Sequence, residues 1–156
     1  MVTVLVLLLG LFAFEAIGYG IHRAMHSRWS GPLWRAHMTH HIKLYPPKDV
    51  LSDTYRDAGH DSAVARYVLV GVVLGALLLW LLPWVMAVGL MAEMAAIGWL
   101  NDYIHDATHI RGVWLERFGW FRRLRELHQV HHRNMRRNLG IVTFLMDHVL
   151  GTFRSS

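Results

Sequence analysis

YVLVGVVLGALLLWLLPWVMAVGLMAEMAAIGWL, residues 67–100, is the stretch that decides the fold. Glu93 is its one charged side chain, and Pro83 stands near its middle. As a single helix this stretch would be about 51 Å long, which is too much for one crossing of a hydrocarbon core of about 30 Å. A proline inside a helix breaks or kinks it. We therefore predict a hairpin of two membrane-spanning helices, at residues 64–82 and 84–104.

A second apolar run, Val2 to Ile21, carries one charge, Glu15. At about 20 residues it is long enough to cross a membrane. A secretory signal peptide would begin with basic side chains, and the first four residues, Met1 to Val4, have none. With 54% of the chain hydrophobic, we expect one integral membrane domain, all-α, with about three transmembrane helices.

The basic residues test this topology. Seven of them lie between the first run and the hairpin, and the other nine lie between Arg111 and Arg154. A hairpin puts all sixteen on one side of the membrane, as the positive-inside rule prefers. We predict a first span at 1–22, a cytoplasmic cap formed by 23–63 and 105–156, and the hairpin at 64–104. The membrane would be the bacterial inner membrane or the endoplasmic reticulum.

Residues 114–137 mix basic side chains with Trp114, Phe118, Trp120 and Phe121. Such a segment suits a helix that rests in the headgroup layer. Nucleic-acid binding uses the same residue types, but this segment is tethered between a membrane hairpin and a histidine cluster, so we expect no nucleic-acid partner. The chain has no cysteine, which excludes disulfides and thiolate ligands.

Ten of the twelve histidines form one pattern written twice. Imidazole is the commonest metal ligand in proteins, and i,i+3 and i,i+4 spacings place side chains on one helix face. Ten nitrogens are enough for two metal ions that each keep one position open. The first copy is His22-x-x-x-His26 with His37-x-x-His40-His41, and the second is His105-x-x-x-His109 with His128-x-x-His131-His132.

The ligand type narrows the choice of metal. Imidazole suits Zn, Cu, Fe and Ni, and a structural zinc site takes four ligands and is closed. Ten histidines exceed that requirement, whereas five nitrogens and a vacant position suit O2 activation. We therefore favour two Fe ions, with Zn as a substitute and O2 as the co-substrate.

Carboxylates near these boxes are candidates to support the ligands rather than to bind metal. Asp102 shares a helix face with His105, and Asp106 directly follows His105 in the sequence. A metal-bound histidine usually donates its far ring N–H to such a group. Glu15 lies on the helical stripe of His22, about two turns away. His60 and His148 stand outside the boxes, and we expect neither to bind metal.

These boxes, followed by the ending Asn138-Leu-Gly and Asp147-His-Val-Leu-Gly151-Thr152-Phe153, resemble the fatty acid hydroxylase superfamily, which includes sterol desaturases. The likeness covers roughly residues 15–153. It implies an O2-dependent dimetal oxidoreductase that hydroxylates or desaturates a C–H bond of a fatty acyl, sterol or carotenoid lipid, with all ten box histidines as ligands. The first box has three residues between its histidines, a spacing similar to that of many sterol-type members, whereas carotenoid and sphingolipid-acyl enzymes typically have four. The third box looks closer to the acyl hydroxylases.

The resemblance also implies a separate electron donor of ferredoxin or cytochrome b5 type, since the chain carries no fused cytochrome domain. We expect the arginines around the last box to attract such an acidic partner: Arg122, Arg123, Arg125, Arg133, Arg136 and Arg137. The alternative is a non-enzymatic, histidine-rich metal-binding or transport membrane protein. A transporter should carry ligands along a path through the bilayer, and these boxes lie at helix ends. Hydroxylation and desaturation stay open.

Overall fold

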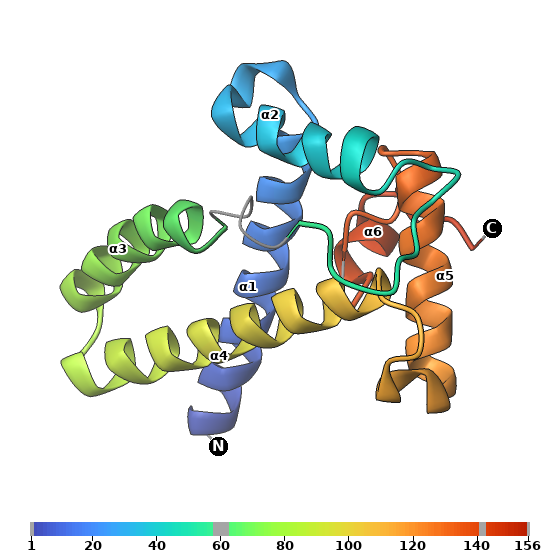
Figure 1. Cartoon of the computed structure of the whole chain (residues 1–156). Coiled ribbons are helices and arrows are strands. Elements are labelled where there is room, and N and C mark those ends of the chain that lie inside the picture. The colour runs from blue at the N-terminus through green and yellow to red at the C-terminus, as the bar shows by residue number, and fades with distance from the viewer. Residues whose placement is uncertain (1, 58–62, 141–142, 156) are drawn as a thin grey trace.

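The computed structural model describes residues 2–57, 63–140 and 143–155, and these contain helices and no β-strand. Helix α1 spans Val2–Met25, α2 spans Pro32–Thr39, α3 spans Ala63–Leu81 and α4 spans Trp84–Thr108 (Figure 1). Helix α5 spans Gly119–Arg133 and α6 spans Leu145–Val149. Three short helical turns complete the order: η1 at Arg28–Ser30, η2 at His40–Leu44 and η3 at Trp114–Arg117.

Proline sets two of the helix boundaries. Pro83 separates α3 from α4 and stands at the N-cap of α4, which confirms the predicted break. Pro32 opens α2 after Gly31, whose φ of 60° is a left-handed conformation that glycine adopts readily. The two helices of the hairpin lie side by side, and α4 also crosses and contacts α1 (Figure 1).

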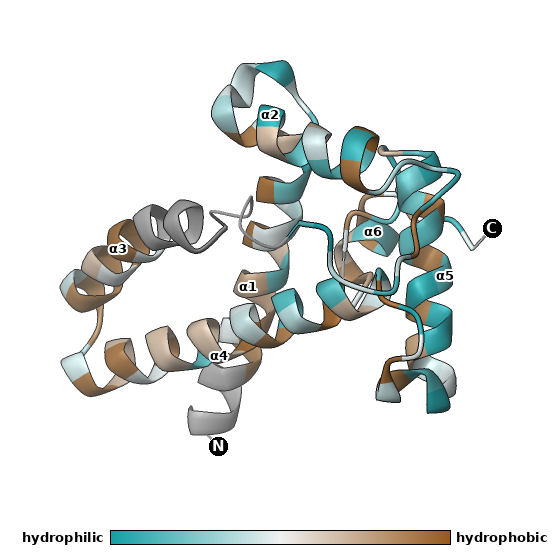
Figure 2. Ribbon diagram, viewed as in Figure 1, coloured by the Kyte–Doolittle hydropathy of each residue, from teal (hydrophilic) through white to brown (hydrophobic). Residues whose placement is uncertain are grey.

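Hydropathy differs between the two ends of the molecule. The described parts of α3 and α4 are mainly apolar, whereas α5 is mainly hydrophilic and the segment around α2 is mixed (Figure 2). Among the described helices, α4 alone is long and apolar enough to cross a membrane, and the apolar stretch found in α3 is the shorter Gly71–Leu81. The three predicted crossings therefore remain a prediction.

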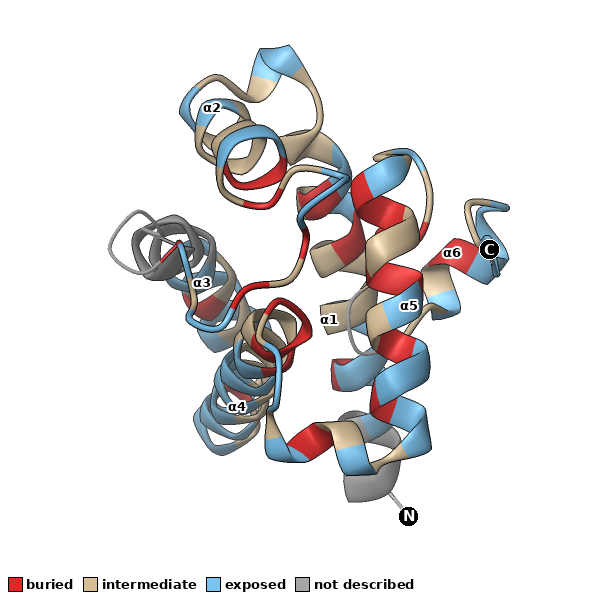
Figure 3. Ribbon diagram, turned by 45° about the vertical axis from the view of Figure 1, so that its right-hand side comes forward, coloured by how far each residue is buried: buried red, intermediate tan, exposed pale blue. Residues whose placement is uncertain are grey.

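Helix α5 packs one face against the rest of the protein, and the placement of residues 114–137 in the headgroup layer stays a prediction. Its apolar residues Phe121, Leu124 and Leu127 are buried inside the protein, and they follow one another at helical spacing. The first two pack with Leu115, Ile104 and Ala107 in the core. Figure 3 shows buried positions along the inner side of α5 and exposed positions over most of α4. The same inner face carries the last histidine box, so burial of this stripe carries those imidazoles inward.

Candidate metal centre

The structure gathers nine of the ten predicted histidines into two groups, and the ring nitrogens of each group lie within 4.8 Å of one another. The first group draws on α1, α2, η2, α5 and the turn after α1. The second draws on η2, α5 and the end of α4. Members of the first group are His22, His26, His37, His41 and His131, and those of the second are His40, His105, His109 and His128.

His132 is the tenth histidine and lies beside the second group. Its Nε2 atom is 3.2 Å from Nε2 of His128. Its ring also stacks on that of His41, a member of the first group, with centroids 4.1 Å apart. The two groups therefore adjoin, and they form one buried cluster to which all ten box histidines contribute.

The two copies of the sequence pattern exchange one histidine each. His40, from the first copy, lies in the second group, and His131, from the second copy, lies in the first. Adjacent residues on a helix point about 100° apart. His40 and His41 therefore face different groups. His37 lies one turn before His41 and points the same way, so both belong to the first group. Neither group is complete without both halves of the chain.

Hydrogen bonds on the outer side of the cluster fix how the rings point. A carbonyl oxygen can only accept a hydrogen bond, so an Nδ1 atom that contacts one must carry the proton. This leaves Nε2 with a free lone pair aimed into the cluster. The pairs are His22 Nδ1 to Leu139 O at 2.5 Å, His109 Nδ1 to Val50 O at 3.0 Å, His131 Nδ1 to Arg137 O at 2.8 Å and His132 Nδ1 to Tyr45 O at 2.8 Å.

The inward nitrogens form a donor set that suits a metal ion. Nε2 of His128 lies 3.1 Å from Nε2 of His109 and 3.2 Å from Nε2 of His132. His109 and His132 carry their protons on Nδ1, so each has a lone pair on Nε2. A single N–H of His128 can satisfy at most one of these two lone pairs. An ion about 2.1 Å from two nitrogens at right angles would set them about 3.0 Å apart. The residues present therefore fit a cation in each group.

The environment keeps these rings neutral, which is the form that binds metal. Burial, followed by the neighbouring histidines, lowers the pKa of His37, His41 and His128 well below its usual value. The same desolvation lowers the pKa of His26 and of His132 to about 3. At pH 7 these histidines offer lone pairs rather than positive charge.

The three predicted supporting carboxylates lie in different places. Asp106 has its Oδ1 atom 3.4 Å from Nδ1 of His105. Asp102 lies one turn before Asp106 on α4. Glu15 belongs to neither histidine group and lines an apolar cavity of about 340 Å³, together with Leu8, Leu11, Phe12, Thr143 and Leu145. His148 is exposed and stacks on Phe153, and His60 falls outside the described residues.

Sequence reasoning missed Asp57, whose Oδ2 atom accepts the hydrogen bond of His40 Nδ1 at 2.9 Å. This carboxylate is buried, and it orients a ring whose Nε2 atom faces the second group. It lies 17 residues after His40, in a polar segment without helical periodicity. No local pattern could have paired the two residues.

Asp147 had a signal in the sequence but no assigned role. Its carboxylate is fully buried and accepts hydrogen bonds from Leu139 N at 2.9 Å, Gly140 N at 2.7 Å and the Thr152 hydroxyl at 2.6 Å. Leu139 in turn supplies the carbonyl that holds His22. The ending quoted above is therefore a brace that positions the first group.

Comparison with known proteins agrees with this geometry. The family model described as fatty acid hydroxylase matches residues 7–152, so the chain belongs to the fatty acid hydroxylase family. A β-carotene hydroxylase of Pseudescherichia vulneris is 30% identical over 149 residues, which cover 92% of this chain and 75% of that protein. The spacing of the first box had pointed away from carotenoid enzymes, whereas this relative is named as one. No solved structure matches the chain.

Proposed function

We propose that this protein is a membrane-bound, O2-dependent di-iron hydroxylase that acts on a lipid C–H bond. The observation that carries the proposal is the pair of adjoining, buried, all-histidine groups whose Nε2 atoms point inward. Five nitrogens per ion, with His132 completing the second group, leave a position for O2 or substrate. A pair of irons, when bound there, supplies the redox chemistry for O–O cleavage.

The protein's own residues hold the ligands and exclude water. Tyr45 is fully buried, stacks on His109 with centroids 4.0 Å apart, and accepts the His132 N–H on its carbonyl. Asp57 holds the ring of His40, and Leu139 holds that of His22. Because these contacts fix the rings before an ion binds, little reorganisation opposes metal binding or turnover.

The apolar cavity beside α1 supports a lipid substrate. Leu8, Leu11 and Phe12 supply hydrocarbon walls, and Glu15 and Thr143 are the polar groups among its lining residues. The β-carotene hydroxylase relative makes a carotenoid the first substrate to test. Fatty acyl and sterol lipids are the alternatives, and desaturation is the alternative reaction because the same oxidant can remove a second hydrogen.

Exposed aromatic residues support a membrane setting with the metal centre at one face. Trp80 and Trp84 flank the turn of the hairpin and are 81% and 71% exposed, and Trp99 near the other end of α4 is 71% exposed. Trp84 and Trp99 are about 22 Å apart along a helix axis. Tryptophan concentrates at both edges of a bilayer. We therefore place α1, α3 and α4 across the membrane and the basic cap in the cytoplasm.

The arrangement of the histidines favours an enzyme over a cation transporter. A transporter needs ligands spaced along a path through the bilayer. Here both groups lie together where α1 and α4 end, at His22 and at His105 with His109.

The test is product analysis with isotopic oxygen. Iron-loaded protein in lipid vesicles would be given β-carotene, a chemical reductant and ¹⁸O2, and the products analysed by mass spectrometry. An alcohol that carries one ¹⁸O atom supports hydroxylation, whereas a dehydrogenated lipid without ¹⁸O identifies a desaturase. Loss of product in His131→Ala with retention in His148→Ala ties the reaction to the histidine groups. Iron-loaded protein that modifies no carotenoid, acyl or sterol lipid would overturn the proposal.

A further inference from the structure

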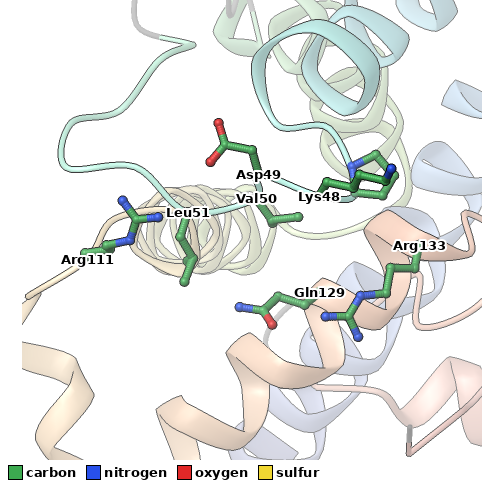
Figure 4. A pocket seen from close by; sticks show the side chains of 8 residues that line it. Lys48, Asp49, Val50, Leu51, Arg111, Gln129 and Arg133 are labelled. Atoms are coloured by element: carbon green, nitrogen blue, oxygen red, sulfur yellow. The ribbon is translucent and has the colours of Figure 1, made fainter.

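A polar cavity of about 180 Å³ opens on the surface of the cap (Figure 4), and it shares no lining residue with the apolar cavity beside α1. The loop before residue 52 forms one wall through Lys48, Asp49 and Val50. Arg111, just after α4, and Gln129 and Arg133 of α5 form the others. Three segments that are distant in sequence therefore present basic side chains to one opening.

One hydrogen bond joins the wall of this cavity to the second histidine group. The carbonyl of Val50 accepts the N–H of His109 Nδ1 at 3.0 Å. Ser52 N donates to the carbonyl of His109 at 2.9 Å, and Arg111 N donates to the carbonyl of Ser52 at 2.9 Å. Three hydrogen bonds thus join the loop to His109 and Arg111, and the Val50 carbonyl connects the wall of the cavity directly to a candidate ligand.

The charges around this opening favour an acidic partner. Lys48 and Arg133 are exposed, and neither forms an ion pair within the described part of the chain. Arg111 lies 3.5 Å from Asp53, and Asp49 lies 2.7 Å from Arg56. The basic groups Lys48, Arg56, Arg111 and Arg133 therefore outnumber the two carboxylates.

Four of the six arginines expected to attract a partner also make contacts within the protein. Arg125 donates to the carbonyls of Ala107 and Ile110 and pairs with Glu116. Three others also bond to the protein's own acceptors: Arg122 to Glu116 O, Arg123 to Glu126 and Ser155 O, and Arg137 to Gly151 O. Of the six arginines, Arg133 is the one that lines the cavity.

We propose that this cavity is the docking site of an acidic one-electron carrier protein and that electrons enter the metal centre through Val50 and His109. The inference rests on the proposed function. Two carrier molecules are each oxidised by one electron. These two electrons, with two protons from water, reduce one atom of O2 to water, while the other atom enters the substrate.

The surface that suits lipid headgroups lies elsewhere. Arg117 sits over the rings of Trp114 and Phe118, at 4.8 Å from each, and Trp114 is 55% exposed. Basic residues mixed with exposed aromatics mark a membrane-facing segment. None of the residues that line the cavity is aromatic, so a soluble acidic protein fits it better than a bilayer does.

The test compares Lys48→Glu, Arg133→Glu and the double variant with Arg136→Glu, an exposed arginine beyond the end of α5 that does not line the cavity. Binding of an acidic [2Fe–2S] ferredoxin and of a soluble cytochrome b5 domain to the metal-free protein gives the first readout. Anaerobic oxidation of the reduced carrier by iron-loaded protein gives the second. We expect the double variant to slow carrier oxidation about tenfold or more at low salt and much less at 0.5 M salt. The neutral variants Lys48→Gln and Arg133→Gln should oxidise the carrier at rates between those of the wild type and of the corresponding glutamate variants.

Reduction by dithionite separates this inference from the proposed function. Dithionite-driven turnover should be the same in all these variants, because none of them alters a ligand. Equal loss of carrier oxidation in Arg136→Glu, or none in the double variant, would overturn the docking site while the enzyme stands. Weaker binding of anionic phosphatidylglycerol by the double variant in detergent, with carrier oxidation unchanged, would overturn it in favour of lipid. Failure of dithionite to support turnover in the wild type would count against the proposed function itself.

Discussion

The Nε2 atoms of His41 and His131 lie 3.3 Å apart, although 90 residues separate them along the chain. The first belongs to the first copy of the histidine pattern and the second to the other copy. Their contact means that an ion bound in the first group would tie η2 to α5. Metal binding should therefore strengthen a junction between the two cap segments that the hydrogen bond from His132 to the Tyr45 carbonyl already makes.

The exchange of His40 and His131 predicts how metal content responds to substitution. Wild-type protein should bind two metal ions per chain, and His131→Ala should empty the first group while the second keeps its ion. His40→Ala should have the converse effect. Elemental analysis of zinc-loaded protein measures this, with His148→Ala as the control that retains both ions. Full occupancy in His131→Ala would show that His131 is not a ligand.

Helix positions and the ten histidines were accessible from sequence because both are periodic signals. The break at Pro83 follows from local chemistry. The exchange of His40 and His131 was not accessible, since it depends on how two distant helices meet. The same holds for Asp57, which reaches His40 from an irregular loop, and for Asp147, whose partners are backbone amides.

Asp57→Asn should weaken metal binding without unfolding the cap. The neutral amide is a poorer acceptor for the N–H of His40 Nδ1, so His40 becomes less basic and less well oriented. Loss of such a partner typically costs about 10–100-fold in metal affinity. A competition titration with a zinc chelator would measure the change. Asp53→Asn, whose side chain is 87% exposed, is the matched control, and equal affinities for the two variants would rule out a supporting role for Asp57.

Gly140→Ala should destabilise the brace around Asp147. A Cβ atom at Gly140 would clash with the carbonyl oxygen of Thr143 and lie 3.1 Å from Oδ2 of Asp147. Overpacking of this kind costs about 1–3 kcal/mol. Gly89→Ala is the control, because a Cβ there meets no atom within 4 Å and alanine favours a helix. Thermal unfolding in detergent should show a lower Tm for Gly140→Ala and an unchanged or higher one for Gly89→Ala. The reverse order would mean that the segment after Asn138 is not tightly packed.

The hairpin topology can be tested by labelling, since the chain has no cysteine of its own. A single cysteine at the α3–α4 turn, Leu82→Cys, should react with a membrane-impermeant maleimide in spheroplasts. One on the cap, Arg28→Cys, should react only after the membrane is disrupted. Protection of both sites before disruption would exclude the crossing of α3 and α4.

Acid should destabilise the metal-free protein, and the sign follows from the lowered pKa values. In the unfolded chain histidine titrates near pH 6.5, whereas in the folded protein burial lowers the pKa of His26 and of His132 to about 3. Between these values the unfolded chain binds more protons than the folded one. The contribution to stability is thus fully present above pH 6.5 and is lost as the pH falls toward 3. Each such histidine lowers the free energy of unfolding by up to about 1.4 kcal/mol per pH unit in that window.

The Tm of metal-free protein in detergent should fall steadily from pH 7 to pH 5, while zinc-loaded protein should hold its Tm until the ion dissociates. Replacement of His132 by Gln, which keeps a polar side chain but cannot titrate, should flatten the slope, and replacement of the exposed His148 should not. A Tm that stays constant from pH 7 to pH 5 in the metal-free protein would mean that these imidazoles are hydrated and that the cluster forms only around its ions.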